Sequence, residues 1–129
     1  MIVLVHPQFA TKSYRQKLLS LWYKQELEKR IALLVHQWES VLAVRVSSYA
    51  TRQMKTRWGT CNTRSKKILL NLELMKKSPD CLEYVVVHEM VHLLEASHNA
   101  RFHALMTKYL PDWKATKHKL NGFTAEKDC

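Results

Sequence analysis

Two histidines and a glutamate stand in the spacing H-E-x-x-H, at His88, Glu89 and His92, inside a strongly apolar stretch of the chain. On a helix, residues four apart lie on one face about a turn apart, so both imidazoles can reach one metal ion with Glu89 beside it as a base. Apolar residues surround these three on nearly every side, which indicates a buried helix. Buried polar groups are costly unless something satisfies them, and a metal ion would satisfy all three.

The start of this helix is marked by Ser78, Pro79 and Asp80. A serine N-cap, a proline at the first position and an acid in the first turn all favour a helix. The valine run at 85–87 alone would favour a strand, but the capping signals and the histidine spacing agree on a helix. The pattern predicts a zinc hydrolase. The alternative is two core histidines bonded to carbonyls, with the glutamate in a salt bridge.

A catalytic zinc site needs three protein ligands and one open position, and His98 is the natural third ligand. In a continuous helix it would lie roughly 15 Å from His88, too far to share an ion. The chain must therefore break between about Leu94 and Ser97 and fold His98 back. Ser97 or Asn99 can cap a following helix, whose apolar face would be formed by Phe102, Leu105, Met106 and Tyr109.

Glu95 is the competing third ligand, because a carboxylate can also complete a catalytic zinc site. It lies three residues past His92 on the expected helix, and a solvated carboxylate that supports the ligands is its other role. A donor to the oxyanion is also needed. Arg101, His103 and Tyr109 are candidates from chemistry and nearness in sequence, although His103 is otherwise expected at the surface or behind the ligands.

The chain has 129 residues, of which 47% are hydrophobic, with two glycines and three prolines. This predicts one compact domain over residues 1–129, with a short N-terminal segment at 1–11 and a frayed tail at 123–129. There is neither an apolar span of about 20 residues nor a signal peptide, so we expect a soluble cytoplasmic protein with no membrane partner. Cys61, Cys81 and Cys129 are odd in number and far apart, and reduced thiols are their simplest state.

The balance of 21 Lys and Arg against 11 Asp and Glu gives a net charge of +10, which favours acidic partners. The basic residues are spread along the chain, so most of them are expected on solvated faces. Weak, sequence-independent binding to nucleic acid is the expected consequence.

Residues 12–38 are expected to form a long amphipathic helix, because apolar residues recur there at helical spacing with charges between them. Its aromatic side chains, among them Tyr14, Trp22 and Trp38, are interpreted as core packing. At the other end of the chain, one helix is expected to reach about Leu110. A Pro111-Asp112 restart then begins a short helix that ends at residues 121–122.

Three strands are expected between the long helix and the H-E-x-x-H helix. Leu42, Val44 and Val46 alternate with smaller or polar residues, which predicts the first strand. Residues 56–61 and 68–71 predict the second and third strands, paired as a hairpin. Gly59 inside a strand indicates a bulge or a close backbone approach, and the edge near residues 58–60 could bind an extended peptide. Strands and helices in these blocks predict an α+β fold.

Several motifs, taken in order, closely resemble the YgjP-like metallopeptidase family and, more distantly, SprT-like proteases. The similarity spans roughly residues 49–120 and rests on Arg57-Trp58-Gly59-Thr60-Cys61, Ile68 to Asn71, Tyr84 to Leu93, His98-Asn99, Arg101-Phe102 and Pro111-Asp112-Trp113-Lys114. This resemblance implies a minimal zincin-like fold, zinc on His88, His92 and His98, and Glu89 as general base and acid.

Two departures from known patterns bear on this resemblance. Members of the family often carry a longer β-rich N-terminal region than residues 1–11, so the substrate groove is expected to be more open or completed differently. The spacing of the three histidines equals that of metzincins, but Glu95 stands where their glycine allows the turn. The chain is therefore not interpreted as a metzincin.

The leading hypothesis is a zinc metallopeptidase that acts on peptides or unfolded proteins. One alternative is a metal-dependent nucleotide or phosphoester hydrolase with a basic pocket around Arg52, Lys55 and Arg57 for phosphates. A second alternative is a nucleic-acid-binding protein with a structural zinc. An open three-ligand site beside Glu89 argues against it, because a structural site is usually closed by a fourth residue.

Overall fold

The computed structural model describes residues 12–122. In chain order its elements are α1 (Lys12–Leu42), β1 (Ser48–Arg52), β2 (Gly59–Asn62), β3 (Lys67–Asn71), the 3-10 helix η2 (Leu72–Lys76), α2 (Pro79–Val91), α3 (Ala100–Tyr109) and α4 (Trp113–Asn121). One small sheet among four α-helices confirms the predicted α+β class. The predicted N-terminal segment 1–11 and tail 123–129 lie outside the described residues, and the single domain over 1–129 stays a prediction.

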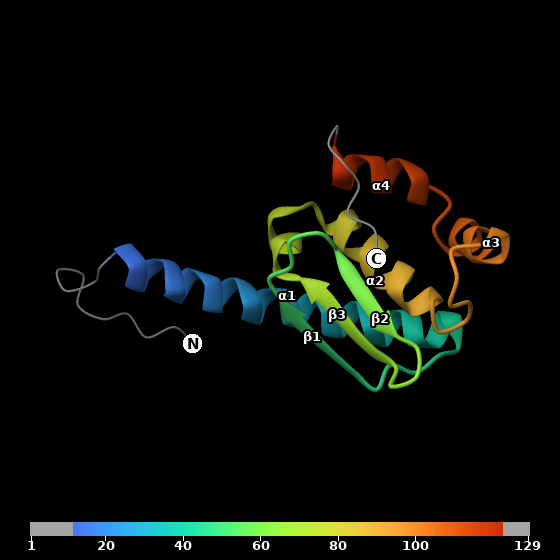
Figure 1. Cartoon of the computed structure of the whole chain (residues 1–129), viewed down its shortest axis with the longest axis horizontal. Helices are drawn as coiled ribbons and strands as arrows, with labels where there is room; N and C mark the ends of the chain where they lie inside the picture. The colour runs from blue at the N-terminus through green and yellow to red at the C-terminus, as the bar shows by residue number, and fades with distance from the viewer. Residues whose placement is uncertain (1–11, 123–129) are drawn as a thin grey trace.

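The sheet has the strand order β1-β3-β2, as Figure 1 shows. β2 and β3 are antiparallel, with Thr60 opposite Leu69 and Cys61 opposite Ile68, which confirms the predicted hairpin. β1 runs parallel to β3. Within the described chain β2 is therefore an edge strand, with no strand paired to its outer side.

α2 is the central element, because it packs against α1, η2, β2, β3, α3 and α4. A helix surrounded on so many sides must be apolar nearly all round. The residues of α2 that are buried include Val85, Val86, Val87, Met90 and Val91. The valine run is thus explained by burial in a helix rather than by strand propensity. No helix among the described residues is long and apolar enough to cross a membrane.

α1 is longer than predicted, and only its second half joins the core. Its buried residues begin at Leu27, and its first half extends beyond the sheet in Figure 1. Trp38 is buried, and its Nε1 donates to Glu83 Oε2 at 3.0 Å, as core packing requires. Tyr14 and Trp22 are 37% and 38% exposed, so the prediction that they pack in the core is wrong. Helical spacing reveals an apolar face but not whether a partner covers it.

The first predicted strand, built on Leu42, Val44 and Val46, is wrong. Leu42 is the last residue of α1, which Ala43 ends with a φ of 55°. The next residues are a loop that Glu39 holds: its carbonyl accepts from Val44 N at 3.2 Å, and its carboxylate accepts from Val46 N at 2.9 Å. Both valines pack partly against the core, and this produces the alternation without a strand.

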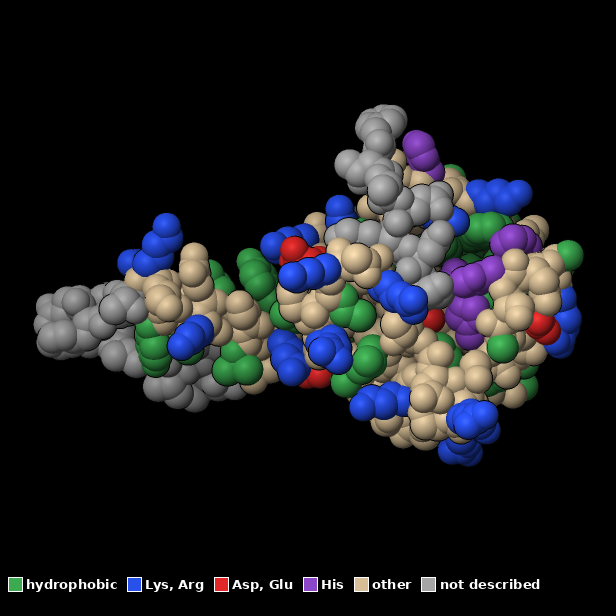
Figure 2. Space-filling model, in the orientation of Figure 1, with side chains coloured by type: hydrophobic (Ala, Val, Ile, Leu, Met, Phe, Trp, Pro, Cys, Tyr) green, Lys and Arg blue, Asp and Glu red, His purple; other side chains and the backbone are tan. Residues whose placement is uncertain are grey.

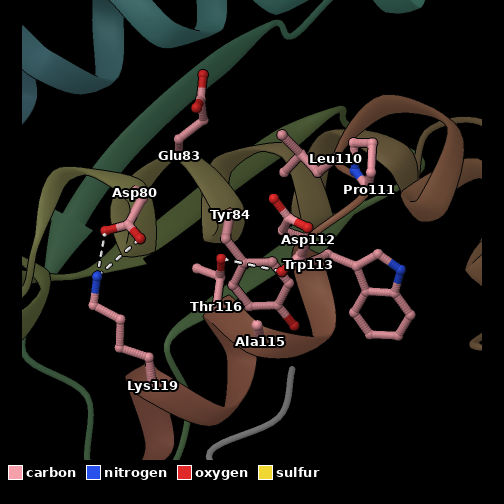
Figure 3. Close-up of a pocket in the computed structure, with 10 residues that line it drawn as sticks. All are labelled: Asp80, Glu83, Tyr84, Leu110, Pro111, Asp112, Trp113, Ala115, Thr116 and Lys119. Atoms are coloured by element: carbon pink, nitrogen blue, oxygen red, sulfur yellow. Dashed lines mark hydrogen bonds and ion pairs between the residues drawn. The ribbon is translucent and has the colours of Figure 1, made fainter.

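α4 is attached to the start of α2. Ser78 takes the predicted N-cap position but makes no side-chain cap bond, and its hydroxyl donates instead to the Asp80 carboxylate. Lys119 Nζ lies 3.1 and 2.9 Å from the two oxygens of Asp80, at the edge of a cavity of about 440 Å³ between the two helices (Figure 3). The hydrogen bond from Ser78 and then that from Lys119 lower the pKa of Asp80 to about 2.

Candidate metal centre

Three histidines from two segments meet at one point. His88 lies on α2, His92 is the C-cap of α2, and His98 lies on the turn that follows. Their ligand nitrogens all lie within 4.8 Å of one another, close enough to hold a metal ion. The ring centroids are 5.0 Å apart for His88 and His92 and 4.7 Å for His92 and His98. The prediction that the chain folds His98 back toward the other two is confirmed.

The turn between the second and third histidines begins earlier than predicted. α2 ends at Val91, and Leu94 N and Glu95 N both donate to the Val91 carbonyl, at 2.8 and 2.9 Å. Glu95 is therefore not on the helix. Its carboxylate accepts from Asn99 Nδ2 at 2.6 Å and from Arg101 Nη1 at 2.9 Å, and these bonds lower its pKa. Glu95 thus braces the turn that carries His98, and its carboxylate is not among the grouped ligand atoms.

Asn99, rather than the alternative Ser97, caps α3, because its side chain accepts from Phe102 N at 3.0 Å. Phe102 is 1% exposed, and its ring lies 4.6 to 5.0 Å from the rings of all three histidines. The cap fixes the start of α3, and the phenyl ring closes the site on the core side. Sequence analysis placed Phe102 on an apolar helix face but missed its place beneath the histidines.

The His92 ring is held in a defined orientation. His92 Nδ1 lies 3.3 Å from the carbonyl of Glu95, so a proton on Nδ1 leaves Nε2 with the lone pair that a metal ligand needs. Burial lowers the pKa of His92, although the charge of Glu89 acts in the opposite direction. A neutral imidazole is the form that binds a metal.

Glu89 is the buried carboxylate of the site, with 1% of its side chain exposed. Its Oε2 lies 3.2 Å from His88 Nδ1, whereas its Oε1 has no hydrogen-bond partner among the described residues. Gly59 of β2 lies directly against it, since a Cβ at residue 59 would be 3.1 Å from Glu89 Cγ and Oε2. The predicted close backbone approach of Gly59 is therefore an approach to Glu89. A carboxylate oxygen buried without a partner is costly unless a bound group satisfies it.

A cavity of about 170 Å³ opens beside Glu89. Residues of and around β2 line one side, and residues of α2 and the turn after it line the other: Arg57, Thr60, Cys61, Thr63, Glu89, His92, Ala96 and His98. Burial, and then the charge of Glu89, raise the pKa of Cys61 to about 11. Its thiol is neutral at ordinary pH and forms a wall of the cavity rather than a reactive thiolate.

The three oxyanion candidates from the sequence have other partners. Arg101 Nη1 donates to the Leu94 carbonyl and to Glu95. His103 stacks on Trp113 with the centroids 5.5 Å apart, and Tyr109 meets the edge of Trp38. None of the three lines the cavity. The arginine that lines the cavity is Arg57, which sequence analysis considered only for phosphate binding.

Figure 2 shows histidine side chains gathered near α2 and α3, with basic side chains scattered over the rest of this face. Of the three residues predicted to form a phosphate pocket, only Arg57 lines the cavity. Arg52 ends β1, at the opposite edge of the sheet from β2.

The fold is that of small metallopeptidases. It is similar to the crystal structure of the zymogen of abylysin from Pyrococcus abyssi, with a TM-score of 0.68 and 15% identity over 77% of this chain and 99% of that one. It is also similar to the zymogen of jannalysin from Methanocaldococcus jannaschii, with a TM-score of 0.60 and 20% identity over 70% and 92% of the two chains. No curated protein sequence matches the chain.

The family follows from the sequence as a whole. Residues 2–123 match the YgjP-like family, metallopeptidase domain, and the chain belongs to this family. It is a metallopeptidase, an enzyme that uses a divalent metal ion to hydrolyse peptide bonds. The resemblance found from the ordered motifs is confirmed, and so is the predicted class of enzyme.

Proposed function

We propose that the chain is a zinc peptidase in which His88, His92 and His98 hold the ion and Glu89 is the catalytic residue. The observation that carries this assignment is the buried Glu89 Oε1, which has no partner in the described chain and lies beside three grouped histidines. Three neutral nitrogen ligands with an open position are the donor set of catalytic zinc. Zinc is favoured over calcium or magnesium, which prefer oxygen ligands.

A zinc ion held there would supply Lewis acidity and lower the pKa of a water molecule. Glu89 accepts the proton of the attacking water and returns it to the leaving amine nitrogen. Gly59 allows β2 to approach this carboxylate, and Phe102 keeps water from the core side of the histidines. Glu95, Asn99 and Arg101 hold His98 in position through the turn.

The substrate is proposed to be an extended peptide or an unfolded protein segment. β2 is an edge strand beside Glu89, and its outer main-chain groups can bind such a segment by strand addition. An antiparallel arrangement is favoured, since antiparallel pairs are the commoner kind. Cytoplasmic location, and weak binding to nucleic acid through the scattered basic residues, stay predictions.

Glu89→Gln tests the proposal. The amide keeps the shape of the side chain but cannot accept a proton, so zinc content should remain at one per chain while peptide hydrolysis falls by about a hundred-fold to ten-thousand-fold. Glu73→Gln removes a carboxylate from η2, away from the cavity, and should leave turnover unchanged. Metal analysis and a screen of unfolded proteins and nucleoside triphosphates should be run on the wild type and on both variants. Near-normal peptide turnover by Glu89→Gln, or cleavage of triphosphates alone, would contradict the proposal.

A further inference from the structure

Among the described residues that line the cavity beside Glu89, Arg57 is the arginine. The residue is exposed, and within residues 12–122 its side chain makes no hydrogen bond or ion pair. Arg101, the other arginine near the site, is bonded to Glu95 and to the Leu94 carbonyl. Arg57 therefore offers a complete set of donors to a molecule that enters the cavity.

The backbone that carries Arg57 is fixed although its side chain is exposed. Asn71, which is 0% exposed, donates from Nδ2 to the Arg57 carbonyl at 2.8 Å and to the Met54 carbonyl at 3.0 Å. Its backbone N donates to the carbonyl of Trp58 at 2.9 Å, and Trp58 is itself buried. The base of the Arg57 side chain is thus held in place, which limits where the guanidinium can reach.

The position of Arg57 just before β2 determines which side of the scissile bond it would face. It lies two residues before Gly59, the first residue of β2 and the one that contacts Glu89. A peptide added antiparallel to β2 runs from the Asn62 end toward the Gly59 end. Its residues on the C-terminal side of the scissile bond then pass Arg57. This step rests on the proposed function and on the proposed direction of the peptide.

We infer that Arg57 is a specificity-determining residue that binds a carboxylate on the C-terminal side of the scissile bond. A guanidinium forms two parallel hydrogen bonds with a carboxylate, and no other pairing of charged side chains matches this geometry as well. The carboxylate belongs to an aspartate or glutamate side chain or to the free C-terminus of a short peptide. A long exposed side chain without partners suits a group already present in the substrate, whereas an oxyanion requires donors fixed in advance.

Matched peptides test this inference. Cleavage sites are first mapped by mass spectrometry in a mixture of unfolded proteins. Peptides built on one such site then carry Asp or Asn at the first or second residue after the cut, and a separate pair ends there as a free acid or an amide. The wild type should prefer the acidic member of at least one pair by about threefold to tenfold in kcat/KM, mainly through KM, since a partly exposed pair contributes modestly.

Variants of Arg57 should change this preference in a graded way. Arg57→Gln should abolish the preference for the acidic peptide, and Arg57→Glu should reverse it toward Lys or Arg at the same position. Arg57→Lys should keep part of the preference, because the positive charge remains but the two parallel hydrogen bonds of the guanidinium are lost. Arg30→Gln removes an exposed arginine from α1, far from the cavity in sequence, and should keep the wild-type preference. If the Asp and Asn peptides differ, Arg57 binds a side-chain carboxylate; if the free acid and the amide differ, it binds the C-terminal carboxylate. An equal fall in kcat for all peptides, without a change in preference, would overturn the inference and make Arg57 a transition-state donor.

A binding measurement separates this inference from the proposed function. Fluorescein-labelled copies of the acidic and neutral peptides are titrated with Glu89→Gln protein, and their dissociation constants are measured by anisotropy. Tighter binding of the acidic peptide, lost in the Glu89→Gln and Arg57→Gln double variant, supports Arg57 independently of any effect of the substitutions on turnover. Equal binding of both peptides by both proteins contradicts the inference. If the wild type cleaves no peptide while zinc is bound, the proposed function fails by itself.

Discussion

Gly59 and Glu89 are in such close contact that the strand leaves no room for a side chain at residue 59. A Cβ there would lie 3.1 Å from Cγ and Oε2 of Glu89 and equally close to Cγ1 of Val85. Both neighbours are buried, so neither can move into solvent. The backbone of β2 therefore acts as a wall that sets the position of the Glu89 carboxylate.

Gly59→Ala should lower kcat by about tenfold or more, because a small displacement of a catalytic group has a large effect on rate. Overpacking should also cost about 1–3 kcal/mol of stability. Peptide turnover and thermal unfolding are the two measurements. The second glycine of the chain is the control: Gly122 has a φ of 62° and nothing within 4 Å of a built Cβ. Gly122→Ala should reduce stability by roughly 1–3 kcal/mol through backbone strain while leaving kcat unchanged. Wild-type turnover in Gly59→Ala would show that catalysis does not depend on the close contact between residue 59 and Glu89.

His98→Ala should lose the metal, since two histidines leave an incomplete site. Glu95→Ala should retain one ion per chain but bind it about tenfold to a hundred-fold more weakly, because the turn that presents His98 loses its bonds to Asn99 and Arg101. Competition with a coloured chelator measures both affinities. The opposite order, with full occupancy in His98→Ala and loss in Glu95→Ala, would make Glu95 the ligand.

The Asp80 carboxylate should titrate at about pH 2 in the folded protein, below its ordinary value of 3.8, because Ser78 and Lys119 bond to the ionised form. A lowered folded-state pKa means that this stabilisation is present above about pH 4 and is lost as the pH falls toward 2. Between these values the wild type should lose stability more steeply than Asp80→Asn in urea unfolding. A carboxyl titration by NMR gives the pKa directly, and Ser78→Ala should raise it. A wild-type midpoint near 3.8 would refute the pairing.

The net charge of +10 should produce weak binding to DNA and RNA without sequence preference. Basic side chains neutralise phosphates and release counterions, so the affinity should fall steeply with salt. Binding should survive Glu89→Gln, because scattered basic faces do not depend on that carboxylate. Titration of a labelled single strand and a duplex at low and near-physiological salt decides it. Tight or salt-resistant binding would point to a dedicated recognition surface, and no binding at low salt would leave the charge without this role.

The arrangement of the three histidines could be predicted from the sequence because its signals are local. The spacing of His88 and His92, the N-cap position of Ser78 and the capping by Asn99 each depend on a few neighbouring residues. The need to fold His98 back followed from the rise of a helix alone. All of these agree with the structure, apart from the break, which comes just after Val91.

The remaining features depend on contacts between distant residues. Asn71 bonds to the carbonyls of Met54 and Arg57 in the loop before β2, and the strand predicted at 56–61 begins only at Gly59. Glu39 draws the residues after α1 into a loop. The main chain of Arg57 is held by that same remote asparagine. No periodicity within a short window contains such information.

The bond between the Trp58 indole and Asn121 has a consequence for how the enzyme is made. Trp58 Nε1 donates to Asn121 Oδ1 at 3.0 Å, across 63 residues of chain, and Trp58 directly precedes β2. While the protein is being synthesised, the ribosome must release α4 before this bond can form. A nascent chain that already holds all three histidines therefore still lacks the bond that fixes the Trp58 ring beside β2, and we expect full hydrolytic activity only once α4 has emerged and docked.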